Sequence, residues 1–140
     1  MTTPSGSAVA RGLLDTSVVI ALDEVPADQL PEEPAISAIT MAELAAGPHA
    51  TDDDDERARR QDRLQAIESL LDPLPFDAAA ARAYGRVSAA TRALGRKPRG
   101  ARAVDLLIAS VALANALPLF TRNPEDFEHL RGLGLDLYAV

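Results

Sequence analysis

The chain has 140 residues, of which 47% are hydrophobic, so it can form one domain around a single sizeable core. It has no cysteine, which excludes a disulfide scaffold, a thiolate metal site and a cysteine nucleophile. The N-terminal residues lack the pattern of a signal peptide, and no apolar run approaches the roughly 18 residues of a membrane span. We therefore expect a cytoplasmic protein that does not contact a membrane.

The net charge of −7, from 21 acidic and 14 basic residues, argues against a surface that coats nucleic acid as a whole. The charges are unevenly distributed along the chain. No acidic residue lies between Asp77 and Asp105, whereas this segment holds half of the basic residues. An acidic protein with one basic segment can still bind a polyanion locally.

The first part of the chain predicts a flexible lead over residues 1–10, followed by a strand and a helix. The apolar strand over 13–15 ends at Asp15, and Thr16 or Ser17 is the expected N-cap of the helix that follows. Asp15 is therefore expected where a strand ends and a helix begins. Open α/β sheets bind their ligands at such positions.

The next part predicts a loop over 23–34, a strand over 35–37 and a helix over 40–46 that ends at Gly47-Pro48. A longer helix then begins in the acidic run 52–56, where acids suit the helix dipole and reach arginines four residues on. We interpret this run as a solvated helix start and not as a metal site. The apolar face of that helix is expected to comprise Leu64, Ile67, Leu70 and Leu71.

The last part of the chain continues the alternation of strands and helices, which favours a parallel sheet covered on both faces. The expected elements are an edge strand over 74–76, a helix over 78–94 capped by Asp77, a loop over 95–102, an apolar helix over 103–116, a strand over 117–121, a short helix from Asn123, and a strand over 135–140.

Four carboxylates fall at comparable places in this pattern. Asp15 ends the first strand, Glu43 and Asp105 are expected in the first turns of helices, and Asp126 follows the strand that ends at Thr121. Each has a structural reading. Thr40-x-x-Glu43 matches a capping box, Asp105 suits a helix dipole, and Asn123-Pro-Glu-Asp126 matches a helix start capped by Asn123.

Taken together, the four acids predict a cation site. Glu43 and Asp105 lie amid apolar sequence, and a charge near a core needs a partner. Oxygen ligands of this kind suit Mg²⁺ or Mn²⁺, which promote phosphodiester hydrolysis. Ser17, Thr121 and Asn123 are candidates to hold metal-bound water molecules.

The sequence resembles the PIN-domain ribonucleases, and within them the VapC-type toxins of bacterial toxin–antitoxin pairs. The matching segments begin at Leu13, Ser37, Val104 and Leu117, and they read LLDTSVVI, SAITMAEL, VDLLIAS and LPLFTRNPEDF. The acidic quartet of the family maps onto Asp15, Glu43, Asp105 and Asp126. Asp15, Asp105 and Asp126 would be metal ligands, with Glu43 acting directly or through water, and Asn123 is an alternative to Asp126 as the fourth ligand.

The resemblance implies a three-layer α/β/α fold over residues 11–140, with a mainly parallel sheet of four to five strands. It also implies a homodimer, an Mg²⁺- or Mn²⁺-dependent endoribonuclease that cleaves tRNA or rRNA, and a small VapB-type antitoxin whose C-terminal segment covers the active site. The residues between Asp52 and Asp77 lie outside the matching segments.

The basic segment fits this interpretation, because it leads into the helix of Asp105. We expect its loop to grip the RNA backbone beside the cleavage site, through Arg96, Lys97, Arg99 and Arg102. The main alternative is a PIN-fold module that binds RNA or protein without catalysis. A receiver-like domain is disfavoured by the position of Lys97, and an Asp-x-Asp-x-Thr phosphatase by Ser17.

Overall fold

The computed structural model describes residues 9–140, so most of the predicted flexible lead lies outside the described residues. Its centre is a four-stranded parallel sheet in the order β2-β1-β3-β4. The strands are β1 (Arg11–Leu14), β2 (Glu33–Ala35), β3 (Leu119–Thr121) and β4 (Leu137–Ala139). This confirms the predicted α/β fold with a parallel sheet of four strands.

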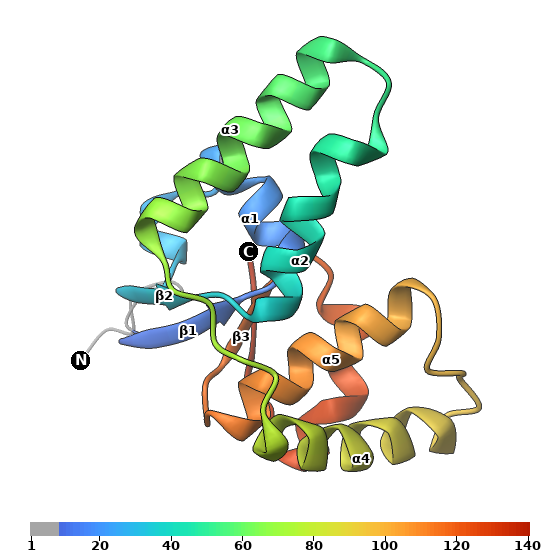
Figure 1. Ribbon diagram of the computed structural model, residues 1–140. Coiled ribbons are helices and arrows are strands. Elements are labelled where there is room, and N and C mark those ends of the chain that lie inside the picture. The colour runs from blue at the N-terminus through green and yellow to red at the C-terminus, as the bar shows by residue number, and fades with distance from the viewer. Residues whose placement is uncertain (1–8) are drawn as a thin grey trace.

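Helices cover both faces of the sheet (Figure 1). Their bounds are α1 (Thr16–Ile20), α2 (Ala38–Ala46), α3 (Asp54–Leu70), α4 (Ala78–Ala93) and α5 (Ala101–Ala114). Figure 1 shows α1, α2 and α3 above the sheet, and α4 and α5 below it. The three-layer arrangement is therefore as predicted.

Alternation along the strands divides the core into two clusters. Leu13 and Leu119 pack with α4 and α5, whereas their neighbours Leu14 and Phe120 pack with α1, α2 and α3. Successive side chains of a strand point to opposite faces, so one apolar strand supplies both cores. Gly12 lies directly under Phe120, where a Cβ atom would come within 2.8 Å of the ring carbon Cδ1.

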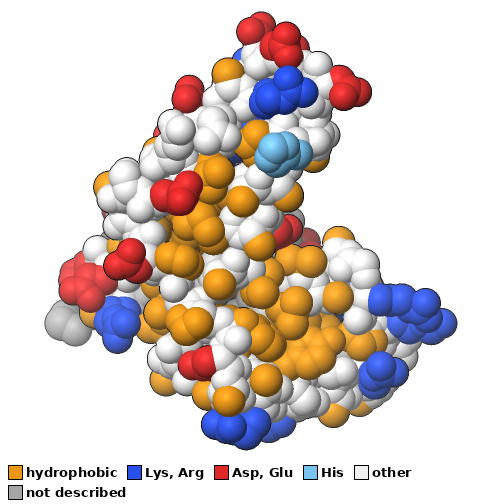
Figure 2. Space-filling model, viewed as in Figure 1, with side chains coloured by type: hydrophobic (Ala, Val, Ile, Leu, Met, Phe, Trp, Pro, Cys, Tyr) orange, Lys and Arg blue, Asp and Glu red, His pale blue; other side chains and the backbone are white. Residues whose placement is uncertain are grey.

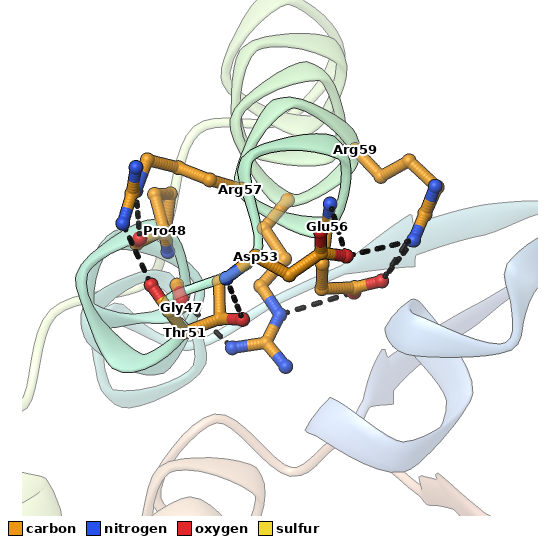
Figure 3. Close-up of polar contacts among 8 residues, drawn as sticks. Gly47, Pro48, Thr51, Asp53, Glu56, Arg57 and Arg59 are labelled. Atoms are coloured by element: carbon orange, nitrogen blue, oxygen red, sulfur yellow. Dashed lines mark hydrogen bonds and ion pairs between the residues drawn. The ribbon is translucent and has the colours of Figure 1, made fainter.

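The acidic run 52–56 starts α3, as predicted, and several of its acids are bound by nearby amides and arginines (Figure 3). The carboxylate of Asp53 caps the helix by accepting from the amide of Glu56 at 3.2 Å. Glu56 pairs with Arg59 at 2.7 Å and with Arg60 at 3.1 Å. Arg57 pairs with Asp54 three residues earlier, and not with Asp53 four residues earlier as the sequence suggests.

Two of these arginines also tie α3 to the segment that precedes it. Arg57 donates to the carbonyls of Pro48 and Thr51, and Arg60 donates to the carbonyl of Gly47 at 2.9 Å. The carbonyls of Gly47 and Pro48 belong to the 3-10 turn Gly47–Ala50 after α2, and Thr51 directly follows that turn. The hydrogen bonds at the start of α3 therefore hold this helix against the segment that follows α2.

Several predicted details are corrected. Leu70 is 72% exposed and does not belong to the apolar face of α3. Residues 74–76 form no strand, because Leu74 makes a single bridge to Ser37 between two prolines. The segment expected as a loop over 23–34 contains two 3-10 turns and most of β2. None of the helices in residues 9–140 has the length and apolarity needed to cross a membrane.

Candidate active site

Asp15 lies at the C-terminal end of β1 and is only 3% exposed. Its own carboxylate is the N-cap of α1, because Oδ1 accepts from the amide of Val18 at 3.1 Å. The predicted caps, Thr16 and Ser17, are instead the first helical residues. Asp15 therefore has the local role that the sequence assigned to its neighbours.

Burial raises the pKa of Asp15 above its ordinary value. Hydrogen bonds from the side chains of Ser17 and Thr121, and from the amides of Val18 and Ser17, lower the pKa in opposition. Ser17 donates to Oδ1 of Asp15 at 2.6 Å and accepts from the amide of Arg122 at 3.1 Å. Ser17 thus joins the end of β1 to the end of β3.

Glu43 lies on α2 with its side chain exposed, and it takes part in no capping box. The N-cap of α2 is Ser37, whose hydroxyl accepts from the amide of Thr40. Oε1 of Glu43 accepts from the hydroxyl of Thr16 at 2.5 Å. The carboxylate therefore points toward the start of α1, and so toward Asp15.

A row of hydroxyls holds Glu43 in this orientation. Thr16 Oγ1 lies 3.1 Å from Thr40 Oγ1, which lies 3.4 Å from the hydroxyl of Ser37. Each hydroxyl has one proton, so all are satisfied when Ser37 donates to Thr40, Thr40 to Thr16, and Thr16 to Glu43. Sequence reasoning missed Thr16 and Thr40, although both are polar residues in the matching segments.

The pKa of Asp105 is influenced by the charges of the other three acids. Burial, followed by the charges of Asp15, Asp126 and Glu43, raises the pKa of Asp105 to about 6, while Arg102 lowers it. A carboxylate that feels three others at once must lie near all of them. Carboxylates that the sequence spreads from residue 15 to residue 126 thus lie within electrostatic range of Asp105.

Asp105 does not lie in the first turn of its helix, contrary to the prediction. α5 begins at Ala101, which places Asp105 in the second turn, where the dipole contributes little. The structural reading of Asp105 as a dipole partner is therefore wrong. Arg102 is likewise helical and not part of the loop.

Asp126 is exposed in the 3-10 turn Pro124–Asp126. Asn123 occupies the N-cap position of this turn and is followed by Pro124, as predicted, but its side chain makes no capping hydrogen bond. Instead, Thr121 Oγ1 accepts from the amide of Asn123 at 3.0 Å. Asp126 and Asn123 both remain available as ligands, and their roles as such stay predictions.

The residues fit a divalent cation by donor chemistry. Asp15, Glu43, Asp105 and Asp126 supply only oxygen atoms, and none of them forms an ion pair within residues 9–140. A bound cation would offset the repulsion that raises the pKa of Asp105. Within the same residues, however, no three carboxylates stand close enough to form a ligand cage in advance.

A groove leads away from Glu43 between α1 and α3. It consists of a pocket of about 280 Å³ that includes Thr16 and Glu43, and a pocket of about 360 Å³ that includes Val19 and Ile67. The two share Ile20, which is 53% exposed, and Arg63. The groove therefore begins beside Glu43 and is lined by both apolar and charged side chains.

The family model of the PIN domain matches residues 12–133. Ribonuclease VapC5 of Mycobacterium tuberculosis is 37% identical over 126 residues, which cover 88% of this chain and 90% of that protein. The crystal structure of VapBC-5 from M. tuberculosis, a member of the VapBC family of toxin–antitoxin systems, superposes with a TM-score of 0.82 at 36% identity, over 94% of this chain and 99% of that chain.

A second solved complex has the same fold. VapBC2 from Rickettsia felis, bound to a DNA fragment from its promoter, matches with a TM-score of 0.73 at 26% identity, over 93% of this chain and 98% of that chain. The profile match extends over most of the domain and includes all four carboxylates. The chain belongs to the PIN-domain family and is a homologue of the VapC ribonucleases.

Proposed function

We propose that this chain is an Mg²⁺- or Mn²⁺-dependent endoribonuclease that acts in the cytoplasm as the toxin of a toxin–antitoxin pair, with tRNA or rRNA as its substrate. The observation that carries the proposal is the environment of Asp105, whose pKa is raised to about 6, first by burial and then by the charges of three other carboxylates. Four acids with no ion-pair partner among the described residues repel one another, and a bound cation would offset that repulsion and attract the phosphates of a polyanion.

Each residue has a distinct part in the proposed reaction. Asp15, held by Ser17 and by the first amides of α1, is the most rigid of the acids and would be the principal metal ligand. Asp105 and Asp126 would complete the ligand set, and Glu43 would bind directly or through water. A divalent ion bound there would polarise the scissile phosphate and lower the pKa of a water molecule.

The hydroxyl groups position these acids. Thr16 fixes the carboxylate of Glu43, and Ser17 fixes that of Asp15. Ser17 and Thr121 also lie at the end of the sheet, where they could orient water molecules beside the ion, as could Asn123. The basic loop set, defined as Arg96, Lys97, Arg99 and Arg102, would hold the phosphates that flank the cut, because Arg102 lies one helical turn before Asp105.

A partner is proposed for the groove. The solved relatives are described as toxin–antitoxin complexes, and a small VapB-type antitoxin is the corresponding partner here. An extended C-terminal segment that lay in the groove over Ile20 would reach Glu43 and block the acids. We also propose a homodimer, and size-exclusion chromatography with light scattering would test it by a mass twice that of the chain.

Cleavage of total bacterial RNA tests the main proposal. The wild-type protein should cleave RNA with Mg²⁺ or Mn²⁺, and EDTA or the substitution Asp15→Asn should abolish cleavage. Asn is as good an N-cap as Asp, so this variant keeps the start of α1. Cleavage that persists in EDTA and in Asp15→Asn would exclude the proposed enzyme. Metal-independent RNA binding without any cleavage would favour the non-catalytic binding module.

A further inference from the structure

The basic residues of this protein fall into two classes. Outside the segment between Asp77 and Asp105, every arginine except Arg63 forms an ion pair with Asp or Glu. Within the segment, none of the basic residues forms one in the part of the chain that the structure describes. This includes the basic loop set and three residues of α4 that the proposed function does not use, the α4 arginines Arg82, Arg86 and Arg92.

The α4 arginines lie along one helix on the outside of the protein. All three are exposed, while Ala80, Ala83, Val87 and Thr91 face the core. At 1.5 Å per residue they extend over about 15 Å of helix. Arg92 lies in the last turn, where a base suits the helix dipole, but the dipole does not account for Arg82 and Arg86.

The basic loop set continues this array from the end of α4 to the start of α5. Gly95 and Gly100 have positive φ values of 74° and 68°, so the chain turns sharply at both ends of the loop. Arg102 donates to the carbonyl of Lys97 at 3.2 Å, which holds the loop closed. Figure 2 shows Lys and Arg side chains along the lower and right edges of the molecule, over α4 and this loop.

We infer that the α4 arginines and the basic loop set together form a docking surface for the sugar–phosphate backbone of double-helical RNA. The inference rests on the proposed function, and it specifies the substrate class as RNA with a paired region beside the cleaved strand. Unpaired positive charges carried along a helix over about 15 Å can contact successive phosphates of a duplex, which proteins recognise largely by shape and backbone contacts.

The aromatic residues argue against an unpaired strand as the occupant of this surface. Proteins that bind single strands stack the bases on exposed aromatic side chains. The chain has no Trp. Phe120 and Phe127 are buried, and Phe76, Tyr84 and Tyr138 are half-buried. The surface therefore offers charge without a stacking platform, which suits a duplex whose bases are already stacked.

The test measures RNA binding by fluorescence anisotropy in the Asp15→Asn background, which prevents cleavage during the measurement. The probes are an RNA hairpin with a stem of about 16 base pairs, an unstructured RNA of equal length, and a DNA duplex of the same sequence as the stem. The variant R82Q/R86Q/R92Q is compared with R11Q/R59Q/R131Q, which removes three ion-paired arginines and the same total charge.

Loss of the α4 arginines should weaken hairpin binding about tenfold and lower the slope of log affinity against log salt by about two to three. The control variant and R82K/R86K/R92K should stay within about twofold of the parent, because lysine keeps the charge. Unstructured RNA should bind more weakly than the hairpin and respond little to either variant.

Equal effects of the two glutamine variants on hairpin binding would overturn the inference, because net charge alone would then explain the affinity. Equal affinity for the DNA duplex or for unstructured RNA would also overturn it. A protein that binds the hairpin through the α4 arginines yet cleaves no RNA with Mg²⁺ or Mn²⁺ would leave the docking surface intact and refute the proposed function instead.

Discussion

The start of α3 and the carboxyl end of the sheet are both rich in acids, but their charges are arranged in opposite ways. At the start of α3 the acids are adjacent in sequence, and Glu56 is bound by Arg59 and Arg60 (Figure 3). At the end of the sheet the acids come from four separate segments. There, Asp105 has three acidic neighbours and one basic one, Arg102.

The pKa values show what this difference means. The pKa of Glu56 is lowered, first by hydrogen bonds from Arg59 and Arg60, whereas the pKa of Asp105 is raised by burial and by other carboxylates. Glu56 in the first cluster is therefore neutralised by the protein itself, whereas the charge of Arg102 does not offset the effects of burial and of three carboxylates on Asp105. A dense acidic run in a sequence thus marks a stable helix start here, and dispersed single acids mark the candidate active site.

The largest contrast is expected in RNA cleavage. Asp15→Asn should reduce the rate by roughly 10²- to 10³-fold, because it removes a charged ligand while keeping the helix cap. Asp54→Asn, at the start of α3, removes the same charge and should leave the rate unchanged. A fluorogenic RNA assay with both variants checks this, and equal losses in the two would contradict the distinction between the clusters.

A smaller effect is expected from the hydroxyl that positions Glu43. Thr16→Val should lower the rate about tenfold, since it removes the donor to Oε1 but keeps the shape of the side chain. Thr16→Ser should restore most of the activity. The measurement is kcat at saturating RNA, with circular dichroism to confirm the fold. An unchanged kcat in Thr16→Val would show that Glu43 needs no such support.

The smallest effect is expected on thermal stability. Removing one acid from each cluster should change the Tm in opposite directions. Because the folded-state pKa of Asp105 is raised to about 6, its contribution to stability is favourable at low pH and is lost as the pH rises from about 4 to about 6. Asp105→Asn should therefore raise the Tm of the metal-free protein at pH 7.5, by roughly 3 °C.

Glu56 should behave in the opposite way. Its lowered pKa means that its contribution is present above the unfolded value of 4.5 and is lost as the pH falls. Glu56→Gln should therefore lower the Tm slightly at pH 7.5. Thermal melts of both variants in EDTA check the signs, and a fall in Tm for Asp105→Asn would show that its carboxylate is already compensated.

Much of the fold could be predicted because its signals are local. Asp77 caps α4 by accepting from the amide of Ala80, as the sequence indicates, and α2 ends at Gly47-Pro48. Apolar strand segments predicted the four parallel strands, with β2 shifted two residues toward the N-terminus. Local patterns failed where several residues compete, as at the start of α1, where Asp15 caps in place of Thr16 and Ser17.

The sequence indicated the four candidate acids, but it did not indicate the hydroxyl contacts that hold two of them in place. The four acids were proposed from the family resemblance and from expected positions at element ends, but Glu43 and Asp105 lie in the second turns of their helices and not in the first. The hydroxyl contacts from Thr16 to Glu43 and from Ser17 to the amide of Arg122 join distant segments, which periodicity cannot reveal. Likewise, the second-turn position of Asp105 depends on α5 starting at Ala101, which follows from the positive φ of Gly100.

The most direct test of the central claim is to locate Mn²⁺ in crystals of the protein by anomalous diffraction. The acids at the end of the sheet should hold the ion, with a peak at coordination distance from Asp15 and Asp105. The start of α3 should hold none, because its own arginines already neutralise Glu56. A peak at residues 52–56 with none at Asp15 would contradict the account.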